Sequence, residues 1–355
     1  MKLLIGGSKS KLFHLEEFAR SVSKYSVECK VVHDVEVYSG FPNRKISSWF
    51  QTRKKFKKLI DDFKPDLILI DNPYAHFGLA AIKSKIPLVI HLRGDYWSET
   101  KWSRETLYKS PHKRFVLWCK NRIGDKCLEE SIAILPLSND LKNIVQKHYP
   151  EKIVETMYQG INPLLWFPVE PMKLKHPCVG LLQDAIIWGK TKEMLTLTKI
   201  LEEMPEINFY WVGDGPFRNK ILSKLKKFEN FHWLGRLSHP EQVRKFLMSI
   251  DIYALVSGFD TLGMTSQEAA LMKKPVLATR IGGIPESMNE NETGFLIEKG
   301  NHQQWVEKIS LLINNQQKAN EMGIKGRSFV ESKFSWDVVA KDTAKNLEKI
   351  LNECS

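Results

Sequence analysis

Short runs of residues that are apolar at nearly every position alternate with amphipathic segments along most of this chain. The clearest run, residues 66–71, reads Asp-Leu-Ile-Leu-Ile-Asp, so a strand there is apolar on both faces. Such strands are typical of parallel sheets covered by helices on both sides, and they indicate the α/β class. The predicted strands are residues 2–5, 27–32, 66–71, 87–92, 132–137, 176–182, 209–212, 231–234, 252–256 and 275–278.

The alternation occurs twice, which predicts two domains of the same kind. At 355 residues the chain is longer than one hydrophobic core usually supports. The pattern restarts after Trp166-Phe167-Pro168, where several prolines favour an extended connection. We therefore expect two Rossmann-like, doubly wound parallel-sheet domains, residues 1–168 and 169–334, facing each other across a cleft. A last helix is expected within residues 335–355, and ligands should bind beyond the carboxyl ends of the strands.

Composition excludes several classes of protein. No apolar run approaches the roughly 18 residues that a membrane-spanning helix needs, and Leu3-Leu4-Ile5 is too short for a secretory signal, so we expect a cytoplasmic protein. The five cysteines are scattered and odd in number, which indicates reduced, structural thiols. Because no Asp-x-Asp triplet and no cluster of His, Asp and Glu with metal-ligand spacing occurs, neither a metal nor another cofactor is predicted.

Positive charge is concentrated in the first half of the chain. Residues 1–168 hold 28 Lys and Arg against 18 Asp and Glu, whereas residues 169–355 hold 25 against 23. Aromatic residues are interleaved with basic ones in residues 44–58 and 101–126, which favours peripheral binding to anionic lipid on the cytoplasmic face of a membrane. A solvated helix face, whose lysine stems cover apolar neighbours, is the alternative. Nucleic acid is not predicted as a partner, because no nucleic-acid-binding module accompanies the charge.

Two acidic residues, Asp260 and Glu268, flank a glycine-containing loop where a predicted strand ends and a helix begins at about Thr265. Backbone N–H groups in such a loop and at a helix N-terminus form a ready anion site. Because both carboxylates can accept hydrogen bonds from ribose or sugar hydroxyls, we expect a sugar-nucleotide site here. Glu268 has an alternative role, since Thr265-Ser-Gln-Glu268 is also a capping-box sequence. Asp260 precedes that cap and has no such alternative.

Three further glycine loops follow predicted strands: Gly6-Gly7-Ser8, Gly213-Asp214-Gly215-Pro216 and residues 280–286. Each allows a backbone to approach a phosphate or a sugar closely, but each also fits an ordinary turn. The first lacks the full G-x-G-x-x-G spacing. The loop at 280–286 follows the strand after residues 252–256, so two glycine loops of one sheet would converge on one crevice.

Three polar residues, His91, Arg93 and Asp95, alternate at the end of the strand predicted for residues 87–92. A period of two places alternate side chains of a strand on one face, toward the same cleft. A functional role is favoured, because a structural one requires three ionisable side chains to find partners.

In their order, these motifs resemble those of the family 4 retaining glycosyltransferases, which have the GT-B fold. The family's Glu-x7-Glu pattern corresponds to Asp260, Leu262-Gly263-Met264 and Glu268. The other matching segments are Gly160-Ile161-Asn162, Gly213-Asp214-Gly215-Pro216, Ala269-Ala270-Leu271-Met272, Pro275-Val276, Gly282-Gly283-Ile284-Pro285-Glu286 and Thr293-Gly294-Phe295-Leu296. The resemblance extends over most of the chain, and so many motifs in one order make it specific.

The resemblance implies that the carboxyl-terminal domain binds a nucleotide-sugar donor. The amino-terminal domain would receive the acceptor, a lipid-linked or membrane-surface glycan or a small molecule. Glu268 would hold the ribose hydroxyls, Asp260 the hydroxyls of the transferred sugar, and the amides of residues 262–264 the diphosphate or sugar. Retention of anomeric configuration and a last helix that packs back on the first domain are implied in the same way. The implied donor-binding residues are Gly7, Lys190, Lys192, Gly213, Gly215, Thr261, Leu262, Gly263, Met264 and Glu268, and the implied catalytic residues are Asp260, Glu268, Arg93, His91 and Asp95.

Three positions depart from the family pattern. Asp260 replaces Glu, which shortens the reach of the carboxylate by one methylene and points to a different donor sugar. Gly180-Leu181 stands where the family has Gly-Arg, so a diphosphate would depend on Lys190 or Lys192. The family's histidine in the first domain aligns with Arg93, and His91 lies two residues earlier, so either residue could face the donor.

Two other functions are compatible with these motifs. Because a fold does not determine a reaction, the chain could be a sugar-nucleotide epimerase or hydrolase. It could also be a non-catalytic sugar-nucleotide-binding partner of another transferase, a reading that Leu181 favours.

Overall fold

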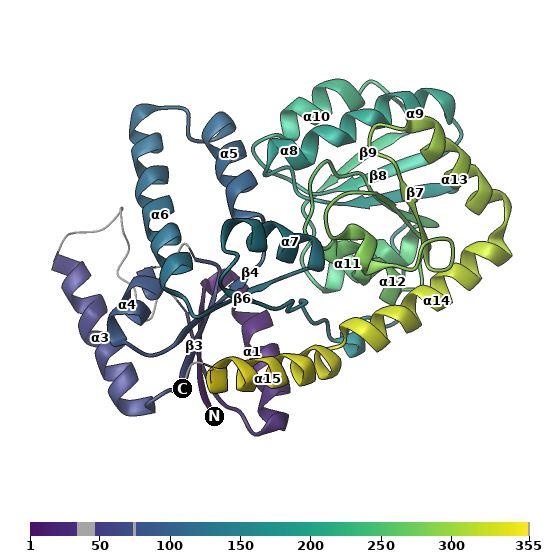
Figure 1. The fold of residues 1–355 in the computed structure, drawn as a ribbon. Helices are drawn as coiled ribbons and strands as arrows, with labels where there is room; N and C mark the ends of the chain where they lie inside the picture. Colours follow the sequence, from purple (N-terminus) through teal and green to yellow (C-terminus); the bar gives the residue numbers. More distant parts are fainter. Residues whose placement is uncertain (34–46, 74–75, 354–355) are drawn as a thin grey trace. The chain divides into compact units, whose positions relative to one another are not determined.

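The structure is a computed structural model that describes residues 1–33, 47–73 and 76–353. The chain forms two compact units, each with its own parallel sheet (Figure 1). Unit 1 comprises Met1–Gly160 together with Trp336–Ser355, and unit 2 comprises Ile161–Ser335. The predicted α/β architecture with two Rossmann-like sheets is therefore confirmed.

Unit 1 contains a six-stranded sheet with the strand order β2-β1-β3-β4-β5-β6, and every pair of neighbours is parallel. The central strands are buried along their whole length, as the apolar runs predicted. The strands are β1 (Lys2–Gly7), β2 (Glu28–His33), β3 (Leu67–Asp71), β4 (Leu88–Leu92), β5 (Ala133–Pro136) and β6 (Ile153–Val154).

Helices cover the sheet of unit 1. They are α1 (Leu12–Val22), α3 (Ser47–Phe63), α4 (His76–Ser84), α5 (Tyr96–Thr106), α6 (Pro111–Glu130), α7 (Asn139–His148) and α15 (Trp336–Glu353), with 3-10 turns η1 (Lys9–Lys11) and η2 (Ser23–Tyr25). The last helix, α15, packs against α1 (Figure 1). The Trp336 and Phe18 rings lie 5.8 Å apart, and Trp336 Nε1 donates to Glu17 Oε2 at 3.0 Å. The predicted return of the last helix to the first domain is thus confirmed.

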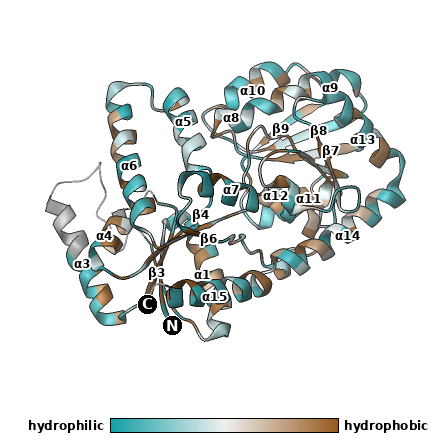
Figure 2. Ribbon diagram, viewed as in Figure 1, coloured by the Kyte–Doolittle hydropathy of each residue, from teal (hydrophilic) through white to brown (hydrophobic). Residues whose placement is uncertain are grey.

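Unit 2 contains a second six-stranded parallel sheet, with the order β12-β11-β10-β7-β8-β9. Its strands are β7 (Cys178–Leu182), β8 (Asn208–Val212), β9 (Phe231–Gly235), β10 (Ile252–Leu255), β11 (Val276–Thr279) and β12 (Gly294–Ile297). Counted from its own first strand, this is the 3-2-1-4-5-6 order of dinucleotide-binding sheets. In unit 1 the central strands β3 and β4 are strongly hydrophobic, whereas β8 and β9 of unit 2 are paler in colour (Figure 2).

The helices of unit 2 are α8 (Trp188–Thr191), α9 (Leu197–Glu203), α10 (Arg218–Leu225), α11 (Glu241–Ser249), α12 (Met264–Leu271), α13 (His302–Asn314) and α14 (Gln316–Phe334), with 3-10 turns η3 (Pro163–Leu165), η4 (Lys192–Thr196) and η5 (Ile284–Ser287). The 3-10 segment η4 directly precedes α9. The hydroxyls of Thr196 and Thr198 bond to Glu193 Oε1 and to the Leu195 carbonyl, and such local bonds compete with the helical ladder.

The two units divide at Gly160, whereas the sequence placed a boundary at residues 168/169. The intervening residues belong to unit 2, because Trp166 is almost fully buried there and its carbonyl accepts from Arg327 at 2.8 Å. The proline-containing segment after residue 168 also belongs to unit 2. The N–H of Met172 donates to the Ser249 hydroxyl, and the N–H of Lys175 donates to the Tyr210 hydroxyl.

Candidate functional site

The switch point of the unit 2 sheet lies between β7 and β10, which are neighbours although they are the first and fourth strands of that unit. The chain leaves the carboxyl ends of two such strands in opposite directions, and ligands of doubly wound sheets bind in the crevice formed there. The loop after β10 contacts α8, because the N–H of Gly258 donates to the carbonyl of Lys190 at 2.9 Å. A Cβ on Gly258 would lie 2.5 Å from the Gly189 carbonyl oxygen, so this approach requires glycine.

Asp260 lies at the centre of this loop and is surrounded by donors. Its Oδ2 accepts from Lys190 Nζ at 2.5 Å. Its Oδ1 accepts from the backbone N–H groups of Thr261 at 2.9 Å, Gly263 at 3.1 Å and Leu262 at 3.5 Å. The sequence suggested that these amides were available to a ligand, but in the structure they bind Asp260 itself. Cation and amides together form a set of donors suited to an anion.

Glu268 is on α12, which begins at Met264 after Gly263 in the left-handed region with φ 73°. Its N-cap is Gly263 rather than Thr265, so the capping-box alternative for Glu268 is wrong. The Thr265 hydroxyl accepts from Tyr253 Oη at 2.5 Å, and Glu268 Oε1 lies 3.0 Å from Nε2 of His239. The hydrogen bond with Glu268 raises the pKa of His239. His239 was not predicted, because no local pattern links it to α12.

The second predicted loop of unit 2, residues 280–286, lies beside the first. It follows β11, the strand next to β10, and a Cβ on Gly263 would lie 3.4 Å from Ile284 Cγ1. The predicted convergence of two glycine loops is therefore confirmed within this unit. The structured element there is the short 3-10 turn η5.

Gly213 and Gly215 hold the loop after β8 against the segment after β7. Their φ angles are 150° and 145°, and a Cβ would lie 2.1 Å from the Gln183 carbonyl oxygen and 2.5 Å from that of Ala185. The N–H of Ala185 donates to the Asp214 carbonyl at 2.8 Å. Backbone packing is therefore sufficient to explain both glycines, with or without a role in ligand binding.

A polar side chain without a partner lies at the carboxyl end of β7. Gln183 is 5% exposed, and neither atom of its side-chain amide has a hydrogen-bond partner in the part of the chain that is described. A buried, unsatisfied amide costs about 1–3 kcal/mol, and such groups are commonly satisfied by water or a ligand. Leu181, where the resembling family has Arg, is fully buried in β7 and offers no charge. Lys192 begins η4, and the lysine that contacts Asp260 is Lys190.

The switch point of unit 1 lies between β1 and β3, and it gathers a charged cluster. Asp71 ends β3 with its side chain 3% exposed, 3.4 Å from His91 Nδ1 and 3.6 Å from Arg93 NH1. Burial raises the pKa of Asp71, but the nearby imidazole of His91 and the charges of Arg93 and Lys11 outweigh it, so that the pKa is lowered. Gly7 ends β1 beside it, where a Cβ would lie 2.5 Å from Leu15 and 3.2 Å from Asp71 Cβ.

Two predicted site residues belong to this cluster: His91 in β4 and Arg93 in the turn that follows. His91 Nε2 lies 3.1 Å from the Met157 carbonyl oxygen, and Arg93 NH1 donates to Gln159 Oε1 at 2.5 Å. Burial and then the charge of Arg93 lower the pKa of Lys11. Asp71, Lys11 and Gln159 were not predicted, although an acid at the end of an apolar run was a usable signal for Asp71.

Asp95 does not share this face. It is the N-cap of α5, where its Oδ1 accepts from the N–H groups of Trp97 and Ser98, each at 3.1 Å. The period-two argument fails for Asp95 because β4 ends at Leu92. Its carboxylate is used to start a helix, a role worth about 1 kcal/mol of stability.

An exposed aromatic face lies on α6 of unit 1. Phe115 and Trp118 are 59% and 57% exposed, and their rings are 5.9 Å apart. A groove of about 490 Å³ beside them is also lined by Arg104 and Arg114. Of the other predicted basic-aromatic stretch, residues 44–46 lie outside the described residues, and α3 carries the rest. No helix in the described ranges is long and apolar enough to cross a bilayer.

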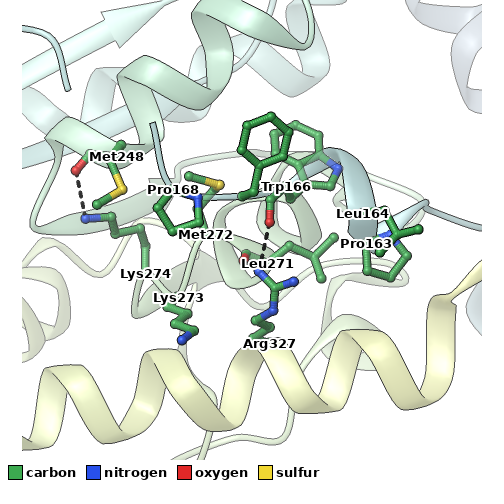
Figure 3. A pocket seen from close by; sticks show the side chains of 11 residues that line it. Pro163, Leu164, Trp166, Pro168, Met248, Leu271, Met272, Lys273, Lys274 and Arg327 are labelled. Atoms are coloured by element: carbon green, nitrogen blue, oxygen red, sulfur yellow. Dashed lines mark hydrogen bonds between the residues drawn. The ribbon is translucent and has the colours of Figure 1, made fainter. Parts of the chain in front are cut away.

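A separate cavity of about 460 Å³ in unit 2 lies between residues 163–168 and the helices α12 and α14 (Figure 3). None of the predicted site residues lines it. Two of the three basic residues in its lining are engaged with backbone, since Arg327 donates to the Trp166 and Leu271 carbonyls and Lys274 donates to the Met248 carbonyl. This cavity is near the far end of α12 and belongs to the packing of the connecting segment.

Two family models match the chain in order. Residues 13–163 match Glycosyltransferase Family 4, and residues 189–329 match Glycosyl transferases group 1. An uncharacterized glycosyltransferase of Methanocaldococcus jannaschii is 28% identical over 90% of this chain and 85% of its own length. The capsular polysaccharide biosynthesis glycosyltransferase CapM of Staphylococcus aureus is 28% identical over 97% of this chain and 98% of its own. Among solved structures, Anabaena HepE in complex with UDP-glucose is 17% identical with a TM-score of 0.69, covering 98% of this chain and all of that one.

Proposed function

Because the chain belongs to the family 4 glycosyltransferases of the GT-B type, we propose that it moves a sugar from a nucleotide-sugar to a glycan acceptor with retention of anomeric configuration. The proposal rests on one observation above all. At the switch point of unit 2, a lysine and three backbone amides surround the carboxylate of Asp260 in one loop, and Glu268 lies on α12, the helix that follows this loop. These are the donors and acceptors that a diphosphate and sugar hydroxyls require.

The donor is held through its charge and its hydroxyls. We assign the diphosphate to Lys190 and the N-terminus of α12, the ribose to Glu268, and the transferred sugar to Asp260. Since Lys190 and the loop amides already bind the carboxylate of Asp260, a diphosphate enters by sharing or replacing that interaction. The unsatisfied amide of Gln183, at the carboxyl end of β7, supplies a further donor and acceptor for the donor substrate.

Catalysis in this scheme is electrostatic. As the glycosidic bond breaks, negative charge develops on the leaving diphosphate, and preorganised cations and N–H groups stabilise it. We propose that Lys190 and the amides at the start of α12 do this without a metal ion. Within unit 1 we propose Arg93, which contacts Asp71 and Gln159, as a catalytic cation.

The acceptor in this proposal is a lipid-linked or membrane-surface glycan. CapM acts in capsular polysaccharide biosynthesis by its name, and HepE was solved with UDP-glucose, so a UDP-sugar is the first donor to examine. The exposed Phe115 and Trp118 beside Arg104 and Arg114 match a face that inserts aromatic rings among anionic headgroups. Under this proposal the protein is cytoplasmic and binds the membrane peripherally.

A thermal-shift panel of UDP-, GDP- and ADP-sugars identifies the donor, since a ligand of the native state alone raises apparent stability. Transfer to an acceptor is then measured for wild type, D260N and E268Q, with E202Q as a control at an exposed ion pair of the same unit. Both site variants should lose at least about tenfold in rate, and E202Q should not. If both D260N and E268Q transfer sugar at the wild-type rate, the assignment of Asp260 and Glu268 to the donor site is wrong.

Membrane binding is tested separately with vesicles of phosphatidylglycerol and phosphatidylcholine at low and high salt. Wild type should bind the anionic vesicles in a salt-sensitive manner. A variant with Ser at both Phe115 and Trp118 should bind less, because it loses the exposed rings. If both proteins bind equally, the exposed rings on α6 do not contribute to membrane binding, and this face is an ordinary solvated surface.

A further inference from the structure

A cluster of three potential metal ligands lies at the amino ends of the two strands whose carboxyl ends carry the donor site. Cys178 begins β7, His176 precedes it by two residues, and Asp251 immediately precedes β10. The two strands are paired in parallel, and the N–H of Asp251 donates to the Cys178 carbonyl at 3.2 Å. We propose that His176, Cys178 and Asp251 bind a thiophilic divalent cation, of which zinc fits best, at the edge of the sheet opposite the donor site.

Two of the distances between ligand atoms are close to those of a tetrahedral ion. The ligand atoms of the three side chains all lie within 4.8 Å of one another. Zinc bonds of about 2.0–2.3 Å place a nitrogen and a sulfur ligand roughly 3.5 Å apart, and His176 Nδ1 lies 3.7 Å from Cys178 Sγ. His176 Nδ1 and Asp251 Oδ2 are 2.8 Å apart as a hydrogen-bonded pair. They must separate by only about 0.5 Å to become ligands of one ion.

The two outer ligands can make that adjustment. The side chain of His176 is 52% exposed and that of Asp251 is 32% exposed, whereas Cys178 is fully buried. An ion would therefore enter from solvent past the imidazole and the carboxylate and meet the thiol below them. Binding replaces the thiol proton with the ion and releases that proton to solvent.

The surroundings of the cluster also suit a metal site. Asp251 Oδ2 accepts from the N–H of Cys178 at 2.8 Å, a bond that orients the carboxylate as supporting hydrogen bonds do in metal centres. Imidazole, thiolate and carboxylate are the ligand types that zinc takes, and three protein ligands leave a fourth position to water. Lys274 interacts electrostatically with Asp251 and Cys178, and its positive charge opposes the binding of a cation. Its Nζ donates to the Met248 carbonyl at 3.0 Å (Figure 3).

The sequence did not predict this cluster. Its histidine and cysteine are two residues apart, but the carboxylate comes 73 residues later, from a different strand. The pairing of β7 with β10 brings the three residues together. A metal-binding motif is recognised by short spacing along the chain, so it does not detect a cluster formed in this way.

The test is a cobalt titration of the full chain after removal of metals with EDTA. A cobalt–thiolate site gives a near-ultraviolet charge-transfer absorption, which should saturate at one ion per chain and disappear when zinc is added. C178S should abolish the absorption, and H176A should weaken binding by at least about 100-fold, since even outer-shell partners contribute 10- to 100-fold. C29S is the matched control and should bind like wild type, whereas K274M should bind more tightly.

Absence of the absorption in wild type, or its persistence in C178S, would overturn the proposal and leave His176 and Asp251 as a simple ion pair. H176A alters an exposed side chain, so circular dichroism should show it folded and its binding result remains interpretable. The proposal is independent of the donor site. EDTA-treated protein should still bind its nucleotide-sugar, so failure of the metal site and failure of the proposed function give different results.

Discussion

Replacing Lys190 by Met tests the centre of the donor site, because it removes the cation that lies 2.5 Å from Asp260. The side chains of Lys190 and Asp260 are 28% and 10% exposed. Breaking a fully buried ion pair costs about 3–5 kcal/mol, whereas exposed pairs contribute about 0–1 kcal/mol. Asp260 keeps its backbone donors, so we expect a loss of about 1–2 kcal/mol in the free energy of unfolding. For a domain of about 150–250 residues this lowers Tm by roughly 2–8 °C.

The same substitution should have a larger effect on catalysis. Removing one preorganised group that stabilises transition-state charge lowers kcat by about 100- to 1,000-fold. Thermal unfolding and the initial rate of sugar transfer are measured on the same preparations. Lys199→Met is the matched control, since Lys199 is exposed on α9 of the same unit. It should leave both quantities unchanged.

The double variant K190M/D260N separates the two effects. In K190M the carboxylate of Asp260 is left without its cation, and Asn removes that charge while keeping the side-chain shape. The double variant should therefore be more stable than the sum of the single losses predicts, by about 0.5–3 kcal/mol, while transfer remains low. Additive stability losses, or wild-type transfer by K190M, would refute the account of this loop.

Three further predictions concern other parts of the molecule. The hydrogen bond with Glu268 raises the pKa of His239, so the pair stabilises the fold below the ordinary histidine value of about 6.5 and loses this as pH rises through the folded-state value. Tm measured across pH 5–9 should fall less in E268Q than in wild type, and parallel curves would contradict the coupling. Asp71 has a lowered pKa and stabilises the fold above its ordinary value of about 3.8, an effect lost as pH falls. Urea unfolding of Arg93→Met should therefore show a loss of about 1–3 kcal/mol at pH 7 and a smaller loss near pH 3, and equal losses would exclude the ion pair as the cause. Burial raises the pKa of Cys127 to about 12, so mass spectrometry should find that iodoacetamide at pH 8 modifies this thiol only after unfolding, not in the folded protein.

The strands were predictable because a buried parallel strand must be apolar on both faces. Residues 66–71 were predicted as a strand and form β3 (Leu67–Asp71). Two strands were not predicted. β6 is only two residues long and has no such run, and the segment that forms β12 was identified only as a motif of the resembling family. Boundaries between units were harder, because the prolines at 168, 171 and 177 indicate an extended chain but not which unit it packs against.

The candidate site was only partly predictable, for a similar reason. Asp260 and Glu268 could be found from loop chemistry and from the family resemblance, since both lie in one continuous segment. His239 could not, because it comes from another element and only the fold brings it close to Glu268. Lys190 was named together with Lys192 through the family resemblance, but its contact with Asp260 was not predicted. Asp95 shows the opposite error, in which a local period was extended beyond the end of its strand.

The most direct test of the donor site is titration calorimetry with the nucleotide-sugar that most stabilises the wild-type protein in the thermal-shift panel. Wild type should bind one molecule per chain, and E268Q should bind it at least about tenfold more weakly, since a charged acceptor for the ribose hydroxyls is lost. Equal affinity of the two proteins, or no binding of any nucleotide-sugar by wild type, would contradict the assignment of Lys190, Asp260 and Glu268 to the donor.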